Sequence, residues 1–305
     1  MELLVGCEQV MINLKLNSTH ISKGVTSYVV NKVAALDHRN AYGPDLCQKI
    51  KNGLTEKAED TCMWVSLVCK ELESVPRDKA LNKTQDFPPG LHLFYHRALD
   101  QLRKGEPDIV KGCMRLLRVM MLVYRPLNVM EVDSVLGLSN FVTSGALVDR
   151  CASFLKMRGT DIEFVHQSAR DYLAGENGKS ILDTTELYGH NEIVVSCLSY
   201  LSQKLKVNLV DLPRPDSMWS FMQQNELLRS LDYSATFWAR HLEGARWEIP
   251  MQRALFKQRV IHTFLYSKFL EWLECLSLLH KLPRATEALE ILKNKADVST
   301  THFVF

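Results

Sequence analysis

A chain of 305 residues, 46% of them hydrophobic and 24% charged, has enough apolar side chains for two or three compact units, which excludes a wholly disordered protein. Its formal net charge is +2, from 37 basic and 35 acidic residues, and the basic residues are dispersed, so neither nucleic acid nor an anionic membrane is indicated as a partner. No apolar stretch reaches the roughly 18 residues that a membrane-spanning helix needs.

The N-terminus and the cysteines bear on the compartment. Glu2 and Glu8 make the start of the chain acidic, whereas a signal peptide begins with basic residues. The 8 cysteines are scattered along the chain, which indicates reduced thiols and not a disulfide framework. We therefore expect a cytoplasmic protein.

Apolar residues at helical spacing predict the structure of the first hundred residues. They indicate four helices, close to residues 17–36, 46–54, 62–73 and 91–102. The last of these follows a helix-breaking stretch, Asp86–Gly90, and ends at the turn Gly105–Pro107. Residues 17–105 are therefore expected to form a small helical bundle.

The next segment combines helices with a hairpin. Ile109–Tyr124 is apolar on almost all sides, which is typical of a buried central helix. Asn128 and Glu131 have the spacing of a capping pair for a short helix, and Ser144–Cys151 predicts another helix.

Beyond these helices the apolar period changes to two. Phe154–Met157 and Ile162–Val165 alternate in this way and flank a turn-forming stretch, Arg158–Asp161, which predicts a β-hairpin. Three helices followed by a hairpin are typical of a winged helix, and we predict one for residues 106–175.

Helical spacing returns after a polar break at Gly175–Ser180. It predicts helices near residues 193–201, 227–242, 250–262, 266–280 and 284–294, with no fixed repeat period. Residues 186–305 are therefore predicted to form a domain of packed antiparallel helices, and the fold class of the chain is mainly α.

Motifs for common enzyme chemistry are absent from the sequence. It contains no G-x-x-x-x-G-K-[ST] phosphate loop, no G-x-G-x-x-G, no G-x-S-x-G, no H-E-x-x-H and no paired C-x-x-C. His92 and His96 have the i, i+4 spacing of a metal-binding pair, but no third ligand converges on them, so a metal site is not expected. The sequence predicts a protein that is not an enzyme.

His166 is the candidate binding residue. It ends the second strand of the hairpin, directly before a helix that is expected to start near Ser168 with Asp171 at its third position. Backbone N–H groups at a helix start attract anions, and an imidazole beside them adds a donor for a phosphate. DNA binding is a weaker alternative, because it needs several cations on one surface, and the hairpin balances its basic residues with acidic ones.

Several stretches together resemble the large fungal NACHT-type signalling NTPases (STAND ATPases). Glu163–Leu173, which contains His166, is similar to the histidine segment of their winged-helix domains. Glu56–Leu72 resembles their lid helix, and Pro88–Leu99 resembles the segment that follows it. Asp232–Leu242 resembles their downstream helical region, so the resemblance runs through nearly the whole chain in the same order.

The resemblance implies a nucleotide-dependent switch. In that family a core that carries the P-loop precedes these segments. The helical lid, winged helix and helical arm hold the protein shut around ADP, and exchange for ATP opens it and drives oligomerisation. The winged-helix histidine contacts the ADP phosphates, a role that maps onto His166. Fungal members act in non-self recognition and programmed cell death.

The chain begins after the place where the resemblance puts the P-loop. Residues 1–16 are therefore expected to be at most the edge of a nucleotide-binding core, before a helical lid domain at residues 17–105. We expect a truncated, regulatory fragment for autoinhibition and signal transmission, without ATPase activity.

ADP or ATP is implied for the full-length family, but no cofactor is expected to bind this chain alone. The expected partners are proteins, including a NACHT core in trans or a second copy of the chain, and neither nucleic acid nor a membrane. A stand-alone helical adaptor for protein–protein interaction is the alternative.

Overall fold

The computed structural model describes residues 18–59, 61–136, 144–176, 178, 189–211, 225–245 and 260–301. Over these residues the chain is mainly helical with one small antiparallel sheet, which confirms the predicted fold class. None of the helices within these ranges combines the length and apolarity needed to cross a membrane. The contacts divide the chain into two compact units, residues 1–100 and 101–305. The finer predicted borders, including the edge of a core at residues 1–16, stay predictions.

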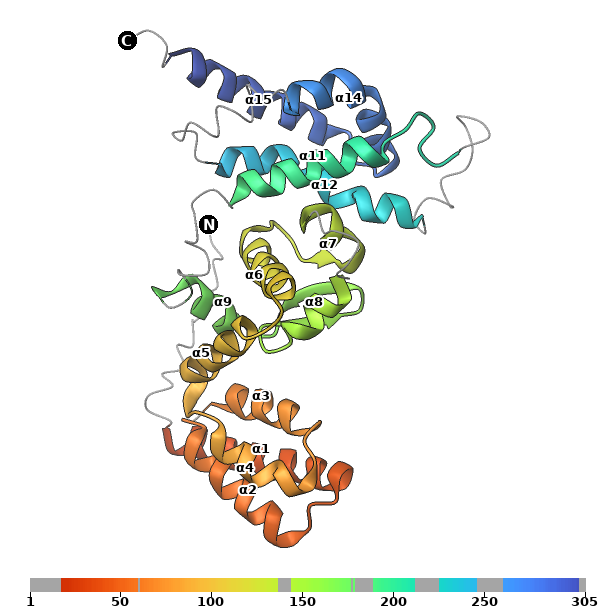
Figure 1. Cartoon of the computed structure of the whole chain (residues 1–305). Coiled ribbons are helices and arrows are strands. Elements are labelled where there is room, and N and C mark those ends of the chain that lie inside the picture. The colour runs from red at the N-terminus through yellow and green to blue at the C-terminus, as the bar shows by residue number, and fades with distance from the viewer. Residues whose placement is uncertain are drawn as a thin grey trace, which may run out of the picture. The chain divides into compact units, whose positions relative to one another are not determined.

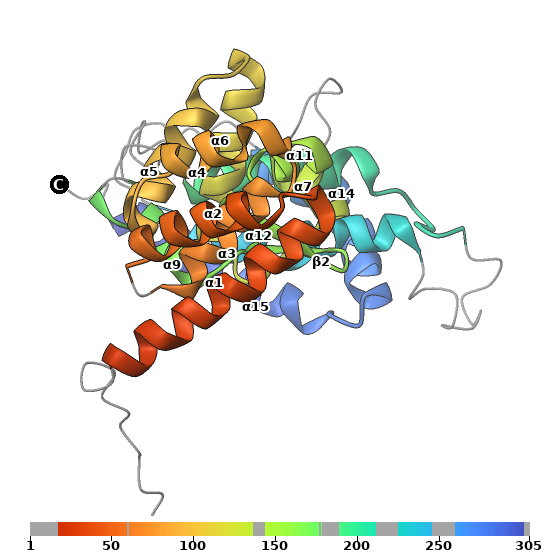
Figure 2. The ribbon, with the colours of Figure 1, turned by 90° about the horizontal axis from the view of Figure 1, so that it is seen from below.

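The first unit is built from consecutive helices. They are α1 (Ser18–Asn40), α2 (Pro44–Lys57), α3 (Cys62–Leu72), α4 (Arg77–Asp86) and α5 (Gly90–Arg103), whose end continues into the second unit. In Figure 2, α1 runs alongside α2 and α3, and its apolar face packs against both. Val33, Ile50 and Trp64 are fully buried there, and the Trp64 indole donates to the Pro88 carbonyl at 3.0 Å.

Helical spacing does not predict α4, because this helix is almost entirely polar and buries only Ala80 and Thr84. Its end is held by Lys57 of α2. The Lys57 ammonium group donates to the backbone carbonyls of Thr84, Gln85 and Phe87 at 3.4, 2.6 and 2.8 Å. These carbonyls lie where a helix lacks internal partners, so a cation satisfies them and α4 forms without a large apolar face.

The second unit begins with helices and a sheet (Figure 1). Its elements up to residue 174 are α6 (Pro107–Leu122), β1 (Leu127–Asn128), α7 (Val129–Leu136), α8 (Ser144–Arg150), β2 (Leu155–Arg158), β3 (Asp161–Phe164) and α9 (Gln167–Ala174). The sheet order is β1-β3-β2, and both pairs are antiparallel. The predicted three helices and hairpin are therefore present in the predicted order.

The hairpin turn is tighter than predicted. Each strand reaches one residue further into the turn, so that only Gly159 and Thr160 connect Arg158 to Asp161. Gly159 has a φ of 63°, which glycine adopts without steric cost. The short strand β1 is not predicted, because two residues cannot show an alternating pattern.

The predicted capping pair at the start of α7 is confirmed. The backbone N–H of Asn128 donates to Oε2 of Glu131 at 2.8 Å, and the N–H of Met130 donates to Oδ1 of Asn128 at 3.0 Å. This reciprocal arrangement satisfies two N–H groups that a helix start leaves unpaired. It also fixes the Glu131 carboxylate at the first turn of α7.

The remaining helices of the second unit pack around α12. They are α11 (His190–Lys204), α12 (Glu226–Gly244), α14 (Val260–Leu278) and α15 (Pro283–Thr301). Trp238 of α12 contacts Phe264 and Trp272 of α14 edge to face, and the Trp272 indole donates to the Ala235 carbonyl at 2.9 Å. α11 and α14 run antiparallel to α12, as Figure 1 shows for α11. A short turn after α14 reverses the chain again, so α15 runs parallel to α12. Arg284 lies against Phe237 near the start of α15, and Lys295 donates to the Glu243 carbonyl further along both helices.

The predicted helices of this region match these elements with two changes of boundary, and one of them is the end of α15 at Thr301 instead of residue 294. The helix expected at residues 250–262 lies outside the described residues up to residue 259. Val260, Ile261 and His262 belong to α14, which therefore starts before the predicted residue 266. Half of the predicted break at Gly175–Ser180, residues 177, 179 and 180, also lies outside the described residues.

Candidate functional site

His166 caps helix α9. Its backbone is extended, with φ −163° and ψ 159°, and the Ser168 backbone N–H donates to the imidazole Nδ1 at 3.1 Å. α9 starts at Gln167, so the predicted start near Ser168 is one residue too late. With Gln167 as its first residue, α9 has Asp171 at its fifth position and not at its third, and Asp171 accepts from the Gln167 side-chain amide at 2.8 Å. His166 is the cap because its extended backbone brings the ring to the Ser168 N–H.

The cap determines where the imidazole carries its hydrogen. Because Nδ1 accepts from a backbone N–H, the neutral ring carries its proton on Nε2. The side chain is exposed, and the cap does not use Nε2–H. This arrangement suits donation to an anion, while the phosphate-binding role of His166 stays a prediction.

Replacing His166 with alanine is expected to destabilise α9 by about 1 kcal/mol, because the Ser168 N–H loses its acceptor. His166→Asn should restore most of this loss, since asparagine is among the best capping residues. Amide hydrogen exchange in α9 measures the effect, with the exposed Arg170→Ala as control. Equal exchange in the alanine and asparagine variants would contradict a capping role.

His92 and His96 lie on α5 as predicted. His96 Nε2 lies 3.5 Å from Asp100 Oδ2, and both side chains are about half exposed. Across the described part of the chain, no three His, Cys, Asp or Glu side chains are grouped closely enough to hold a metal ion.

A buried carboxylate joins α7 to α12. Glu131 is 1% exposed and pairs with both terminal nitrogens of Arg125, at 2.8 and 2.5 Å. It also accepts from the Asn128 N–H and, at 3.0 Å, from the backbone N–H of Tyr233 in α12. Four donors therefore satisfy this carboxylate, which a buried charge requires.

The same cluster continues to the turn before α15. Arg125 lies 3.3 Å from Oδ2 of Asp232, and the Lys281 ammonium group donates to Oδ1 of Asp232 at 2.5 Å. The Asp232 carboxylate on α12 thus bridges Arg125, which lies beside α7, and Lys281, which lies between α14 and α15. Ser134 of α7 and Ser234 of α12 add a buried hydrogen bond of 2.8 Å.

A second chain of polar groups, buried at Tyr233 and His241, connects α11 to α12. The Tyr124 N–H donates to the Tyr233 hydroxyl at 3.2 Å, and that hydroxyl lies 2.8 Å from His241 Nε2. His241 Nδ1 lies 2.7 Å from His190 Nδ1. Burial lowers the pKa of His241 to about 3, with smaller effects of the His190 and Arg240 charges, and burial also lowers the pKa of His190. Both imidazoles are therefore neutral at pH 7.

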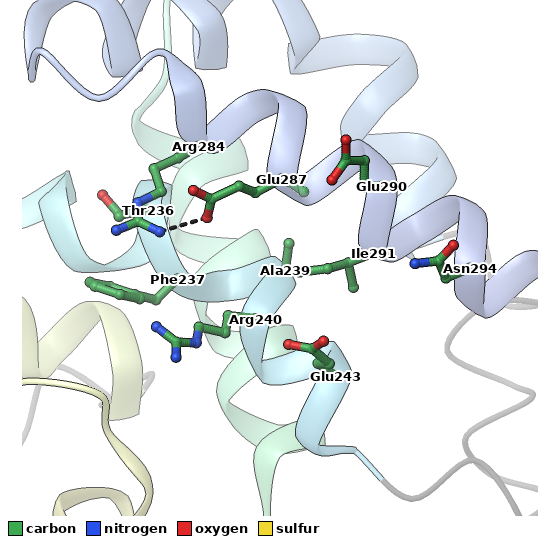
Figure 3. A pocket seen from close by; sticks show the side chains of 11 residues that line it. Thr236, Phe237, Ala239, Arg240, Glu243, Arg284, Glu287, Glu290, Ile291 and Asn294 are labelled. Carbon is green, nitrogen blue, oxygen red and sulfur yellow. Dashed lines mark hydrogen bonds and ion pairs between the residues drawn. The ribbon is translucent and has the colours of Figure 1, made fainter.

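An open groove of about 400 Å³ runs between α12 and α15 (Figure 3). Phe237, Ala239 and Ile291 line its floor, and Arg284 pairs with Glu287 at 2.5 Å on its wall. The Arg240 guanidinium stacks over the Tyr124 ring at 4.5 Å. The Thr236 hydroxyl, which also lines the groove, donates to Oδ1 of Asp232 at 3.1 Å.

Sequence reasoning identifies only part of this site. The spacing of Asn128 and Glu131 predicts the cap, but nothing near Glu131 in the sequence points to its partner Tyr233 on α12. The stretch Asp232–Leu242 is singled out by its resemblance alone. Asp232 is a charged residue inside an otherwise apolar helical pattern. A residue of this kind is the sequence signal for a buried ion pair between helices.

Fold and site together define a mainly helical protein whose buried polar groups join its helices to one another. Its sequence is similar to that of the vegetative incompatibility protein HET-E-1 of Podospora anserina, with 29% identity over 320 residues. The match covers 96% of this chain and 23% of HET-E-1, so the chain spans less than a quarter of that relative's length. No family model matches the chain. No solved structure matches it.

Proposed function

We propose that this chain is a regulatory, non-enzymatic segment of a NACHT-type nucleotide-dependent switch that acts in non-self recognition. The ordered resemblance to that family and the similarity to a vegetative incompatibility protein over 96% of the chain support the class. In this proposal residues 106–175 are a winged helix that responds to the nucleotide state. Residues 186–305 are the helical arm that passes the response on.

The buried carboxylate of Glu131 is the observation that carries the transmission role. Its bonds to Arg125 and to the Tyr233 N–H link the first turn of α7 to the middle of α12. Separating the two helices would leave the Tyr233 N–H without its acceptor and would break the Arg125–Asp232 pair. The unsatisfied N–H alone costs about 1–3 kcal/mol. α7 and α12 are therefore expected to move as one body, so a displacement of the winged helix reaches the arm.

His166 is the proposed contact to nucleotide. Its Nε2–H, which the cap does not use, and the positive end of α9 suit a phosphate, and a nucleotide-binding core would have to supply the remaining contacts to ADP. The nucleotide would bring the negative charge that draws α9 toward the core. The chain itself then contributes one hydrogen-bond donor and a helix start, without ATPase activity of its own.

A chimera tests this function. We would replace the matching segment of HET-E-1 with this chain and measure the incompatibility reaction in Podospora anserina. His166→Ala is expected to give the reaction without an incompatible partner, because ADP no longer holds the protein shut. His166→Asn should do the same, since asparagine restores the cap but places no donor at the position of Nε2.

The two variants separate a binding role from a structural one. Normal behaviour of the asparagine variant beside a deregulated alanine variant would assign His166 to capping alone. Normal behaviour of both, at equal protein levels, would overturn the nucleotide role. It would favour the alternative of a helical adaptor, which is supported by two large apolar side chains one turn apart on α14, Tyr266 at 87% and Leu270 at 74% exposure.

A further inference from the structure

Two buried thiols meet where α6 packs against α8. Cys113 lies on α6 and Cys151 directly follows α8, and neither is exposed to solvent. The helices approach closely here, because a side chain at Gly112 would place its Cβ 2.9 Å from Leu147 of α8. The Cys151 thiol forms a side-chain hydrogen bond with Cys113. The two sulfur atoms are therefore direct neighbours.

We propose that Cys113 and Cys151 form a reversible disulfide when the chain meets a low-molecular-weight disulfide such as oxidised glutathione, which cross-links α6 to the end of α8. This site is independent of the nucleotide role of His166. It rests on the contact between the two thiols and on the close packing of the helices that carry them.

The environment assigns a different role to each sulfur. The hydrogen bond from Cys151 lowers the pKa of Cys113 against the effect of burial, and the charge of Arg150 lowers it further. The same hydrogen bond and burial raise the pKa of Cys151. Burial, with a smaller effect of the Glu131 charge, raises the pKa of another core thiol, Cys197, to about 12. Cys113 is thus the sulfur that ionises first and attacks.

The exchange balances in two steps. The Cys113 thiolate attacks one sulfur of oxidised glutathione, which forms a mixed disulfide and releases one glutathione thiolate. Cys151 then loses its proton to that thiolate and attacks the Cys113 sulfur, which forms the Cys113–Cys151 bond and releases the second glutathione. The two cysteines are oxidised by two electrons, and one glutathione disulfide is reduced to two thiols.

Because both thiols are buried, the rate of this reaction depends on how often α6 and α8 separate. Oxidised glutathione cannot reach either sulfur while α6 and α8 are packed, so the first step needs a local opening of these helices. Once formed, the bond holds α6 and α8 together and constrains the unfolded chain. The oxidised protein should therefore melt at a higher temperature than the reduced protein, and a dithiol reductant should reverse the difference.

Mass spectrometry of the full chain tests the proposal. The protein is incubated in glutathione buffers with a rising oxidised fraction, quenched with N-ethylmaleimide in denaturant, and digested without reduction. The linked Cys113–Cys151 peptides should increase with the oxidised fraction. Cys62, which is exposed, serves as the internal control and should carry glutathione. Recovery of Cys113 and Cys151 as free thiols under conditions that modify Cys62 would overturn the proposal.

Variants give a second readout. Cys151→Ala should abolish the rise in melting temperature on oxidation, whereas Cys275→Ala, a matched buried cysteine, should keep it. An unchanged rise in the Cys151→Ala protein would mean that another pair is cross-linked, and it would contradict the assignment. The peptide measurement on the unmodified chain decides the question even where a variant does not fold.

Discussion

Replacing Glu131 with alanine is expected to lower the free energy of unfolding of residues 101–305 by about 3 kcal/mol. The substitution removes the carboxylate that pairs with Arg125 and leaves the N–H groups of Asn128 and Tyr233 without their acceptor. Breaking a buried ion pair from one side costs roughly 3–5 kcal/mol. The lower end applies here, because the Arg125 side chain is 30% exposed and keeps Asp232 as a partner.

Urea unfolding followed by tryptophan fluorescence measures this loss. Glu131→Gln should retain part of the stability, since its amide oxygen accepts one or two of the four bonds but its NH₂ group faces donors. Glu290→Ala, at an exposed position on α15, is the matched control and should stay within about 0.5 kcal/mol of the unmodified chain. A Glu131→Ala protein as stable as that control would show that the cluster does not hold α7 to α12.

The contrast between the two halves of this cluster shows how far the sequence alone reaches. The cap formed by Asn128 and Glu131 is predictable, because both residues lie within one helical turn. The bond from Glu131 to Tyr233 joins residues 102 positions apart, and no local pattern encodes such a pairing. The same limit explains α4, whose polar helix depends on Lys57 of α2 and not on its own apolar spacing.

His166 shows a second limit. The sequence places it correctly between the hairpin and a helix, because the change of apolar period marks that junction. The sequence does not predict that His166 itself caps the helix, because histidine is not among the common capping residues. The extended backbone of His166 brings Nδ1 to the Ser168 N–H, and this geometry follows from the strand that precedes it.

Acidification is expected to destabilise the second unit through the paired histidines of α11 and α12. Burial lowers the pKa of His241 to about 3, whereas an unfolded histidine titrates near 6.5. Below pH 6.5 the unfolded chain therefore binds a proton that the folded chain does not take up. The stabilising contribution is complete above pH 6.5 and is lost as the pH falls toward 3.

The size of this effect follows from the gap between the two pKa values. One pH unit within the gap changes the free energy of unfolding by about 1.4 kcal/mol, so lowering the pH from 6.5 to 5 should cost about 2 kcal/mol. The neighbouring His190 adds to the loss, because burial also lowers its pKa and its Nδ1 lies 2.7 Å from that of His241. Protonation of either ring would place a charge against the other.

A non-titrating variant isolates the histidine from the carboxylates that also titrate below pH 6. His241→Gln can accept from the Tyr233 hydroxyl and donate to His190, so it keeps both hydrogen bonds without taking up a proton. The difference in unfolding free energy between the unmodified chain and this variant, measured by urea unfolding from pH 7.5 to 5, should shrink or reverse as the pH falls. His262→Gln, at an exposed position on α14, should show no such trend.

Parallel pH profiles for the unmodified chain and His241→Gln would mean that the buried imidazole takes up its proton while the protein stays folded. The site of His190 and His241 would then accommodate a protonated imidazole, and water would have to enter between α11 and α12.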